Sequence, residues 1–251
     1  MRIIDLSAII ATSPEGTPDY SRTEIQYSTH ADGAAQAAML NVPAHLFRDS
    51  EGWATECITR LETHGTTHVD APWHYNSRIK GQRAQTIDLL PLEWFFSNGV
   101  KLDFSCKEDG DAITVDDIKT ELERIAYQLK PLDIVLVQTG RDIYYGSPDY
   151  FFKGCGVTNE ATRWLYDQGI RVMGIDAWGW DKPLHLQAGE ALAKNEAGVF
   201  WSAHQAGIPY SHMERLVNLA ALPPTGFQVA CFPLKIQNAS AAPARVVAIL
   251  T

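Results

Sequence analysis

One stretch constrains this chain more than any other. Residues 64–74, HGTTHVDAPWH, hold three of the eight histidines and a carboxylate within eleven positions. A continuous helix is disfavoured there, because several residues are β-branched and Pro72 would clash with the preceding turn. A fully extended strand would separate His64 and His68 by roughly 13 Å. The chain is therefore expected to bend near Gly65-Thr66 if the two imidazoles are to act together.

The side chains of this stretch predict a metal site. A bend would let His64, His68 and Asp70 converge on one ion, while Pro72 stiffens the exit and presents His74. Imidazole and carboxylate ligands together suit Zn, Mn or Fe, whereas Ca and Mg prefer oxygen ligands. Three protein ligands leave a position for water, as a catalytic site requires. The alternative is a polar loop with ordinary hydrogen bonds, which such a dense cluster disfavours.

The same stretch resembles the signature H-x-G-T-H-x-D-x-P-x-H of the metal-dependent cyclase family, which includes bacterial kynurenine formamidases and isatin hydrolases. The match covers six positions and departs at Thr66, where the family usually has Gly; the matching residues are His64, Thr67, His68, Asp70, Pro72 and His74. The resemblance implies that His64, His68 and Asp70 bind the metal. It implies that His74 is the general acid/base. It further implies a swivelling β/β/α fold and a homodimer or higher homo-oligomer.

The composition is that of an ordinary globular protein, with 45% hydrophobic and 20% charged residues in 251. The net charge of −9 argues against nucleic acid or an anionic membrane as the main partner. No apolar run approaches the length of a membrane span, and the first residues read as a strand, not a signal peptide. The four cysteines are scattered, which favours a reduced, cytoplasmic setting. We expect a single domain over residues 1–251.

The remaining pattern predicts an α/β fold. Strands are expected at 2–10, 23–28, 100–104, 133–139, 170–176, 227–234 and 244–250. Helices are expected at 114–129, at 158–168 and at 188–207, the first two capped by Thr114 and Thr158. Strands and helices that follow one another in this way indicate α/β layers around one core.

A second constellation, Asp176-Ala177-Trp178-Gly179-Trp180-Asp181, follows the strand expected at 170–176. Trp178 and Trp180 could form an aromatic wall for a flat substrate, or they could simply pack over the core. Trp73 would face the same substrate, with Trp94 and Trp201 as further candidates. The family resemblance implies that Asp176 supports the site from behind, and Thr67 is a candidate to stabilise an oxyanion.

The resemblance also implies a later His and Glu that complete the metal site, and His204 and Glu214 are the best matches. Their interval is ten residues, two shorter than in the formamidases, so either residues are deleted between them or His212 takes the place of His204. For Glu214 an alternative remains: Ser211 and Glu214 have the spacing of a capping box that would open a helix.

These observations predict a hydrolase of a carbon–nitrogen bond (amide, lactam or formamide) or of a lactone, in a small cyclic or aromatic substrate. One or two Mn²⁺ or Zn²⁺ ions would activate water, and His74 would be the general base. One alternative is a metal-dependent lyase or dehydratase. Another is a metal- or small-molecule-binding protein without catalysis, which His74 argues against.

Overall fold

The computed structural model describes residues 1–17 and 19–250. By its contacts the chain groups into two compact units, one made of residues 1–8 and the chain from residue 66 on, the other of residues 9–65. We call them unit 1 and unit 2. The single domain over residues 1–251 therefore stays a prediction. No helix among the described residues is long and apolar enough to cross a membrane.

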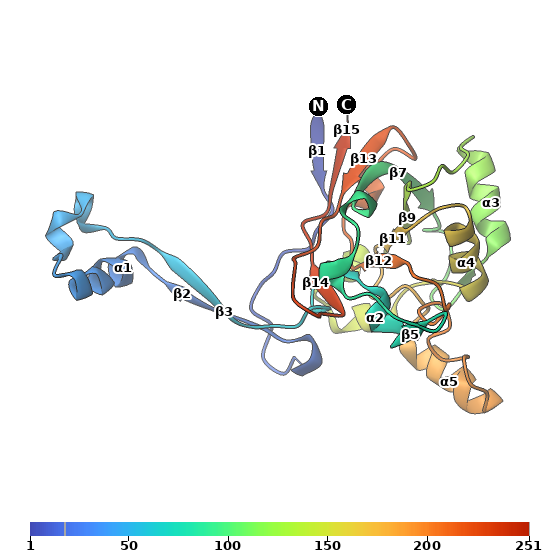
Figure 1. Cartoon of the computed structure of the whole chain (residues 1–251), viewed down its shortest axis with the longest axis horizontal. Helices are drawn as coiled ribbons and strands as arrows, with labels where there is room; N and C mark the ends of the chain where they lie inside the picture. The colour runs from blue at the N-terminus through green and yellow to red at the C-terminus, as the bar shows by residue number, and fades with distance from the viewer. Residues whose placement is uncertain (18, 251) are drawn as a thin grey trace. The chain divides into compact units, whose positions relative to one another are not determined.

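Unit 2 is built on a pair of antiparallel strands, β2 (Thr23–Ser28) and β3 (Thr55–Leu61). The strand predicted at 23–28 is thus confirmed. Helix α1 (His30–Gln36) follows β2 directly (Figure 1). It begins there because the Thr29 side chain accepts a hydrogen bond from the Asp32 backbone N–H, and the Asp32 carboxylate accepts one from the Thr29 backbone N–H.

In its described residues, unit 1 contains one nine-stranded sheet, in which the strands lie side by side in the order β1-β15-β13-β7-β9-β11-β12-β4-β14. The strands are β1 (Arg2–Asp5), β15 (Val247–Leu250), β13 (Phe227–Ala230), β7 (Phe96–Asp103), β9 (Ile134–Gln138), β11 (Val172–Ile175), β12 (Ser211–Glu214), β4 (His68–Asp70) and β14 (Ala241–Pro243). Neighbours among β7, β9, β11 and β12 run parallel, while the outer strands pair antiparallel.

The central strand β9 is buried along its whole length, as its apolar sequence predicts. Its side chains alternate between two cores. Val135 and Val137 belong to the cluster that includes residues of α3 (Val115–Arg124) and α4 (Asn159–Asp167). Ile134 and Leu136 belong to the cluster that includes β1, β13 and β15 residues. Figure 1 shows α3 and α4 together beside the sheet. The sheet thus lies between two apolar cores, and this packing fixes the positions of its strands.

Both capped helices form where the sequence predicts them. Thr114 accepts a hydrogen bond from the Asp117 backbone and begins α3, and Thr158 begins α4 in the same way. Helix α3 is shorter than predicted, because Ala126 adopts a left-handed backbone (φ 51°) that ends it. Gly169 (φ 92°) lies just beyond the end of α4, as expected.

One predicted helix has the wrong bounds, and one alternative is wrong. The helix predicted at 188–207 is α5 (Leu184–Lys194), and after Asn195 (φ 49°) the chain continues in turns. The helix that Ser211 and Glu214 would cap does not form, because both lie in strand β12. The capping pattern was misleading because hydrogen bonds to β4 and β11 hold these residues extended. Apart from short 3-10 turns, the remaining helix and strands of the described residues are α2 (Pro72–Tyr75), β5 (Arg78–Ile79), β6 (Gln82–Arg83), β8 (Ala112–Ile113) and β10 (Gly156–Val157).

Candidate metal centre

The site is built on two paired strands. In the antiparallel register of β4 and β12, His68 lies opposite Glu214 and Asp70 lies opposite His212. Side chains two apart on a strand share a face, and opposed residues on paired strands have Cβ atoms about 5 Å apart. All four polar side chains therefore stand on one face. Val69 and Met213 point the other way, into the core.

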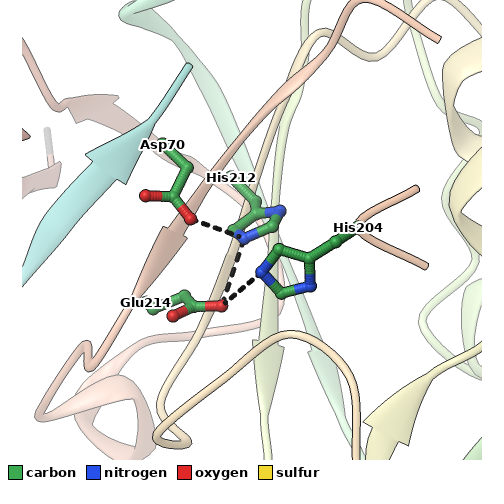
Figure 2. A group of neighbouring side chains, drawn as sticks. All are labelled: Asp70, His204, His212 and Glu214. Carbon is green, nitrogen blue, oxygen red and sulfur yellow. Dashed lines mark hydrogen bonds and ion pairs between the residues drawn. The ribbon is translucent and has the colours of Figure 1, made fainter. Parts of the chain in front are cut away.

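The donor atoms of these residues nearly touch. His212 Nε2 lies 3.1 Å from Asp70 Oδ2 and 3.1 Å from Glu214 Oε1. His204, which comes from the turns after α5, places its Nε2 3.4 Å from Glu214 Oε1 (Figure 2). His68 Nε2 lies 3.2 Å from Asp70 Oδ1 and 3.7 Å from Glu214 Oε2. Five side chains thus converge, and we call them the His/carboxylate cluster.

Each imidazole of the cluster is held from behind by its other nitrogen. His68 Nδ1 lies 2.7 Å from the Thr66 carbonyl oxygen, which can only accept a hydrogen bond. His204 Nδ1 lies 2.5 Å from Asp181 Oδ2. His212 Nδ1 lies 3.2 Å from the hydroxyls of both Tyr75 and Tyr210; both rings are buried.

The Thr66 carbonyl requires a proton on Nδ1 of His68, and the Asp181 carboxylate does the same at His204. A neutral imidazole with that proton presents Nε2 as an acceptor, the arrangement typical of metal-ligating histidines, whereas a second proton on Nε2 lets the ring donate to the carboxylates.

The cluster concentrates negative charge away from water. Asp70 is fully buried, and Glu214 is 6% exposed. Burial alone would raise the pKa of Glu214, but hydrogen bonds from His204 and His212 hold that pKa well below its usual range. Burial alone would lower the pKa of His204, but hydrogen bonds to Asp181 and Glu214 raise it to about 10. Two buried carboxylates in contact with imidazoles need positive charge, which protons or a cation can supply.

The cluster fits a divalent metal ion. Asp70, His204, His212 and Glu214 can each offer one ligand atom, and these atoms all lie within 4.8 Å of one another. Ligand bonds of about 2.1 Å around one ion place neighbouring donors about 3.0–3.4 Å apart, in octahedral or tetrahedral geometry. The separations of 3.1–3.4 Å that link these four residues match that range. The mixture of imidazole and carboxylate is also typical of Zn and Mn sites.

His74 lies at the edge of the cluster. Pro72 is the first residue of the short helix α2, where its missing N–H costs nothing, and the helical turn brings His74 back towards β4. The His74 Nε2 atom lies 3.9 Å from Asp70 Oδ2, and its side chain is 22% exposed, unlike those of His68 and Asp70. It is therefore near the cluster and open to a ligand.

The other predicted residues fall into distinct places. His64 belongs to unit 2, so its role as a ligand stays a prediction. The Thr67 hydroxyl donates to the Arg215 carbonyl (2.5 Å) and accepts from the Ala8 N–H (2.9 Å), so it ties segments together. Asp176 is buried and accepts hydrogen bonds from the Thr139 N–H and hydroxyl and from the Gly140 N–H. Burial outweighs these bonds and raises the pKa of Asp176 to about 6.

The tryptophans do not form one wall. Trp180 is completely buried, stacks on His212 and donates from its indole to Thr162, so it lies in the core. Trp178 and Trp73 are half-buried. Trp201 stacks on His204 and meets His74 edge-on, with ring centroids 4.4 and 5.0 Å away.

His212 and Asp181 carry more of the site than the sequence indicated. His212 and Glu214 occupy alternate positions, the spacing that puts both on one face of a strand. That signal was hidden by the apparent capping box. Asp181 accepts from the backbone N–H groups of Ala203 and His204 (2.9 and 3.1 Å) as well as contacting the His204 ring. It joins two loops distant in sequence, so spacing could not reveal it.

Fold and cluster together define an α/β protein with a buried centre of the metal-binding type. The family model described as "Putative cyclase" matches residues 4–182, and the chain belongs to this family. The resemblance inferred from residues 64–74 is thereby confirmed. His204, His212 and Glu214 lie beyond the matched residues.

Solved structures agree with the fold. Isatin hydrolase A from Labrenzia aggregata, bound to benzyl benzoate, is 23% identical with a TM-score of 0.72, over 100% of this chain and 94% of that chain. An isatin hydrolase bound to the product analogue thioisatinate is 20% identical with a TM-score of 0.72, over 99% and 92%. A potential metal-dependent hydrolase with cyclase activity is 21% identical with a TM-score of 0.61, over 98% and 96%.

At these identities the likeness shows the fold alone, and the predicted α/β class of the cyclase family is confirmed. A search of curated proteins found no match.

We expect Asp70→Asn to lose bound metal, because the amide keeps the shape but removes the charge and one acceptor oxygen. Metal analysis of the purified protein after loading with Mn²⁺ or Zn²⁺ measures this. Asp149→Asn, at an exposed position, should keep the wild-type content. Full occupancy in Asp70→Asn would contradict the role of Asp70.

We expect Asp181→Asn to weaken metal binding by about 10- to 100-fold, because the carboxylate that orients His204 is lost. Titration against a competing chelator gives the affinity, and circular dichroism checks folding. Asp167→Asn, exposed at the end of α4, is the matched control. An affinity equal to that of the control would show that Asp181 serves only to join the loops.

Proposed function

We propose that this chain is a metal-dependent hydrolase that opens a carbon–nitrogen bond or a lactone in a small cyclic or aromatic substrate. The observation that carries the proposal is the orientation of three imidazoles, each anchored through Nδ1, with Nε2 directed at two buried carboxylates. Its supports are the family to which the chain belongs and the fold it shares with isatin hydrolases.

The metal would be held by the His/carboxylate cluster, with His64 as a further ligand predicted from the family motif. When bound, Mn²⁺ or Zn²⁺ lowers the pKa of water and polarises a carbonyl. Five side chains with two carboxylates offer enough ligand atoms for one ion or two. The buried tyrosines and Trp180 around His212 exclude water from behind the cluster.

His74 would move the proton. Its imidazole lies beside Asp70, within reach of the cluster and open to solvent. It can accept a proton from the attacking water and deliver it to the leaving nitrogen or oxygen, a role suited to a group whose ordinary pKa is near neutrality. Trp201, edge-on to His74, limits its motion on one side. Thr67 is less suited to stabilise an oxyanion, because its hydroxyl is donated to the Arg215 carbonyl.

Half-buried Trp73 and Trp178, with Trp201, supply aromatic surface for a ring-shaped substrate. The small-molecule substrate, the homodimer or larger assembly and the cytoplasmic location remain predictions from the sequence.

The function is tested with isatin-like rings, formylanilines and lactones, each offered to the Mn- and Zn-loaded protein. We expect ring opening or deformylation, with one oxygen from ¹⁸O-labelled water in the product carboxylate. Product without the label would indicate a lyase. Asp70→Asn is the inactive reference. No turnover of any of the three classes by fully metal-loaded protein would overturn the proposal.

We expect His74→Ala to keep its metal and to lose about 10²- to 10⁴-fold in turnover, the usual contribution of a general acid/base. Metal content and kcat are measured on the same preparation. His185→Ala, exposed on α5, should behave as wild type. Undiminished kcat in His74→Ala would remove the general base from the mechanism.

A further inference from the structure

Arg215 is an unusual arginine. It directly follows Glu214 and is only 6% exposed. Its backbone is fixed on both sides, since its N–H donates to the Ala177 carbonyl (3.0 Å) and its carbonyl accepts from Thr67 (2.5 Å). The residue has a left-handed backbone, φ 59°, which turns the chain at the end of β12. Its position is therefore set by the same strands that build the His/carboxylate cluster.

The guanidinium of Arg215 has no polar partner in the described part of the chain. Its Nε is buried without a hydrogen bond, and no carboxylate forms an ion pair with it. By contrast, Arg141 pairs with Asp109, and Arg163 donates to the Ala206 carbonyl. A buried charge is normally paired, because leaving it unpaired is costly. The guanidinium thus keeps its hydrogen-bonding capacity for a ligand.

The surroundings of Arg215 are aromatic and lie beside the cluster. The guanidinium carbon is 4.8 Å from the centre of the Trp178 ring, and Phe151 meets that ring edge-on. Two residues after Trp178, the Trp180 N–H donates to Glu214 Oε1 (2.8 Å). Arg215 is therefore the sequence neighbour of Glu214, and Trp178 lies two residues from Trp180, whose N–H contacts the Glu214 carboxylate. A guanidinium that lies over an aromatic ring can donate hydrogen bonds from its edge to a planar anion such as a carboxylate.

We propose that Arg215 binds a carboxylate of the ligand, on the substrate or on the product, with the guanidinium donating two parallel hydrogen bonds. The proposal rests on the proposed function for one source of that anion: water added across an amide or lactone bond gives a carboxylic acid and an amine or alcohol. At neutral pH the acid is a carboxylate, which a guanidinium binds bidentately. Arg215 would then distinguish anionic from neutral ligands.

Benzoate and its neutral counterpart benzamide are the probes, titrated calorimetrically into metal-loaded protein. We expect Arg215→Gln to weaken benzoate binding by about tenfold or more, since hydrogen bonds between charged groups are the strong ones, and to leave benzamide unchanged. Arg215→Lys keeps the positive charge but not the paired N–H donors of the guanidinium, so it should lose less benzoate affinity than Arg215→Gln. Arg171→Gln is the matched control, because Arg171 also lies over a ring, that of Tyr166, but donates to the backbone carbonyls of Tyr166 and Ile170.

Metal content and circular dichroism are measured for each variant, so that loss through unfolding or an empty metal centre is recognised; Arg215→Lys serves as the test if Arg215→Gln does not fold. Equal benzoate affinity in wild type and the tested variant would overturn the proposal, as would wild-type protein that does not bind benzoate. A weaker affinity of the variant for benzamide as well would also overturn it, because the effect would not depend on charge.

Two further substrates separate the sources of the anion. A substrate carboxylate predicts a raised KM of Arg215→Gln for N-formylanthranilate but not for formanilide. A product carboxylate predicts weaker inhibition by the product of a neutral substrate. Failure of all hydrolysis would defeat the proposed function and leave the benzoate titration valid.

Discussion

The antiparallel pairing of β4 with β12 is the constraint on which the site depends. It sets His68 opposite Glu214 and Asp70 opposite His212, so that four polar side chains from residues 68–70 and 211–214 share one face. A shift of one residue in this register would turn the donors of one strand into the core and bring Val69 or Met213 to the site. The nine-stranded sheet that contains these two strands therefore also fixes the positions of the cluster side chains (Figure 1).

Burial strengthens the electrostatic interactions within the cluster and favours the binding of a cation there. The carboxylates of Asp70 and Glu214 lie in a low-dielectric region, where charges interact strongly. Asp181, the Thr66 carbonyl and two tyrosine hydroxyls orient the three imidazoles from behind. Protons and a metal ion compete for the same Nε2 atoms, and the carboxylates of Asp181 and Glu214 that raise the pKa of His204 also attract a cation.

The loop that follows β11 connects the core to the ligand side of the site. Within six residues it supplies the Asp176 carboxylate to Thr139, the Trp180 N–H to Glu214 and the Asp181 carboxylate to His204. The same loop carries Trp178, which stacks on Arg215. Binding surface and metal centre are thus positioned by one short segment at the end of a parallel strand, where α/β proteins commonly place their ligand sites.

The sequence by itself determined what is local. Side-chain types in residues 64–74 indicated the family, alternation and apolar runs indicated the central strands, and Thr114 and Thr158 marked the helix starts, because caps and periodicity act over a few residues. Only the tertiary structure decided that Ser211–Glu214 is a strand, that Trp180 is core, and that Asp181 and His212 join the site. These outcomes depend on pairing and packing between segments that are distant in the sequence, which no local pattern encodes. The paired strands β4 and β12, for example, are more than a hundred residues apart.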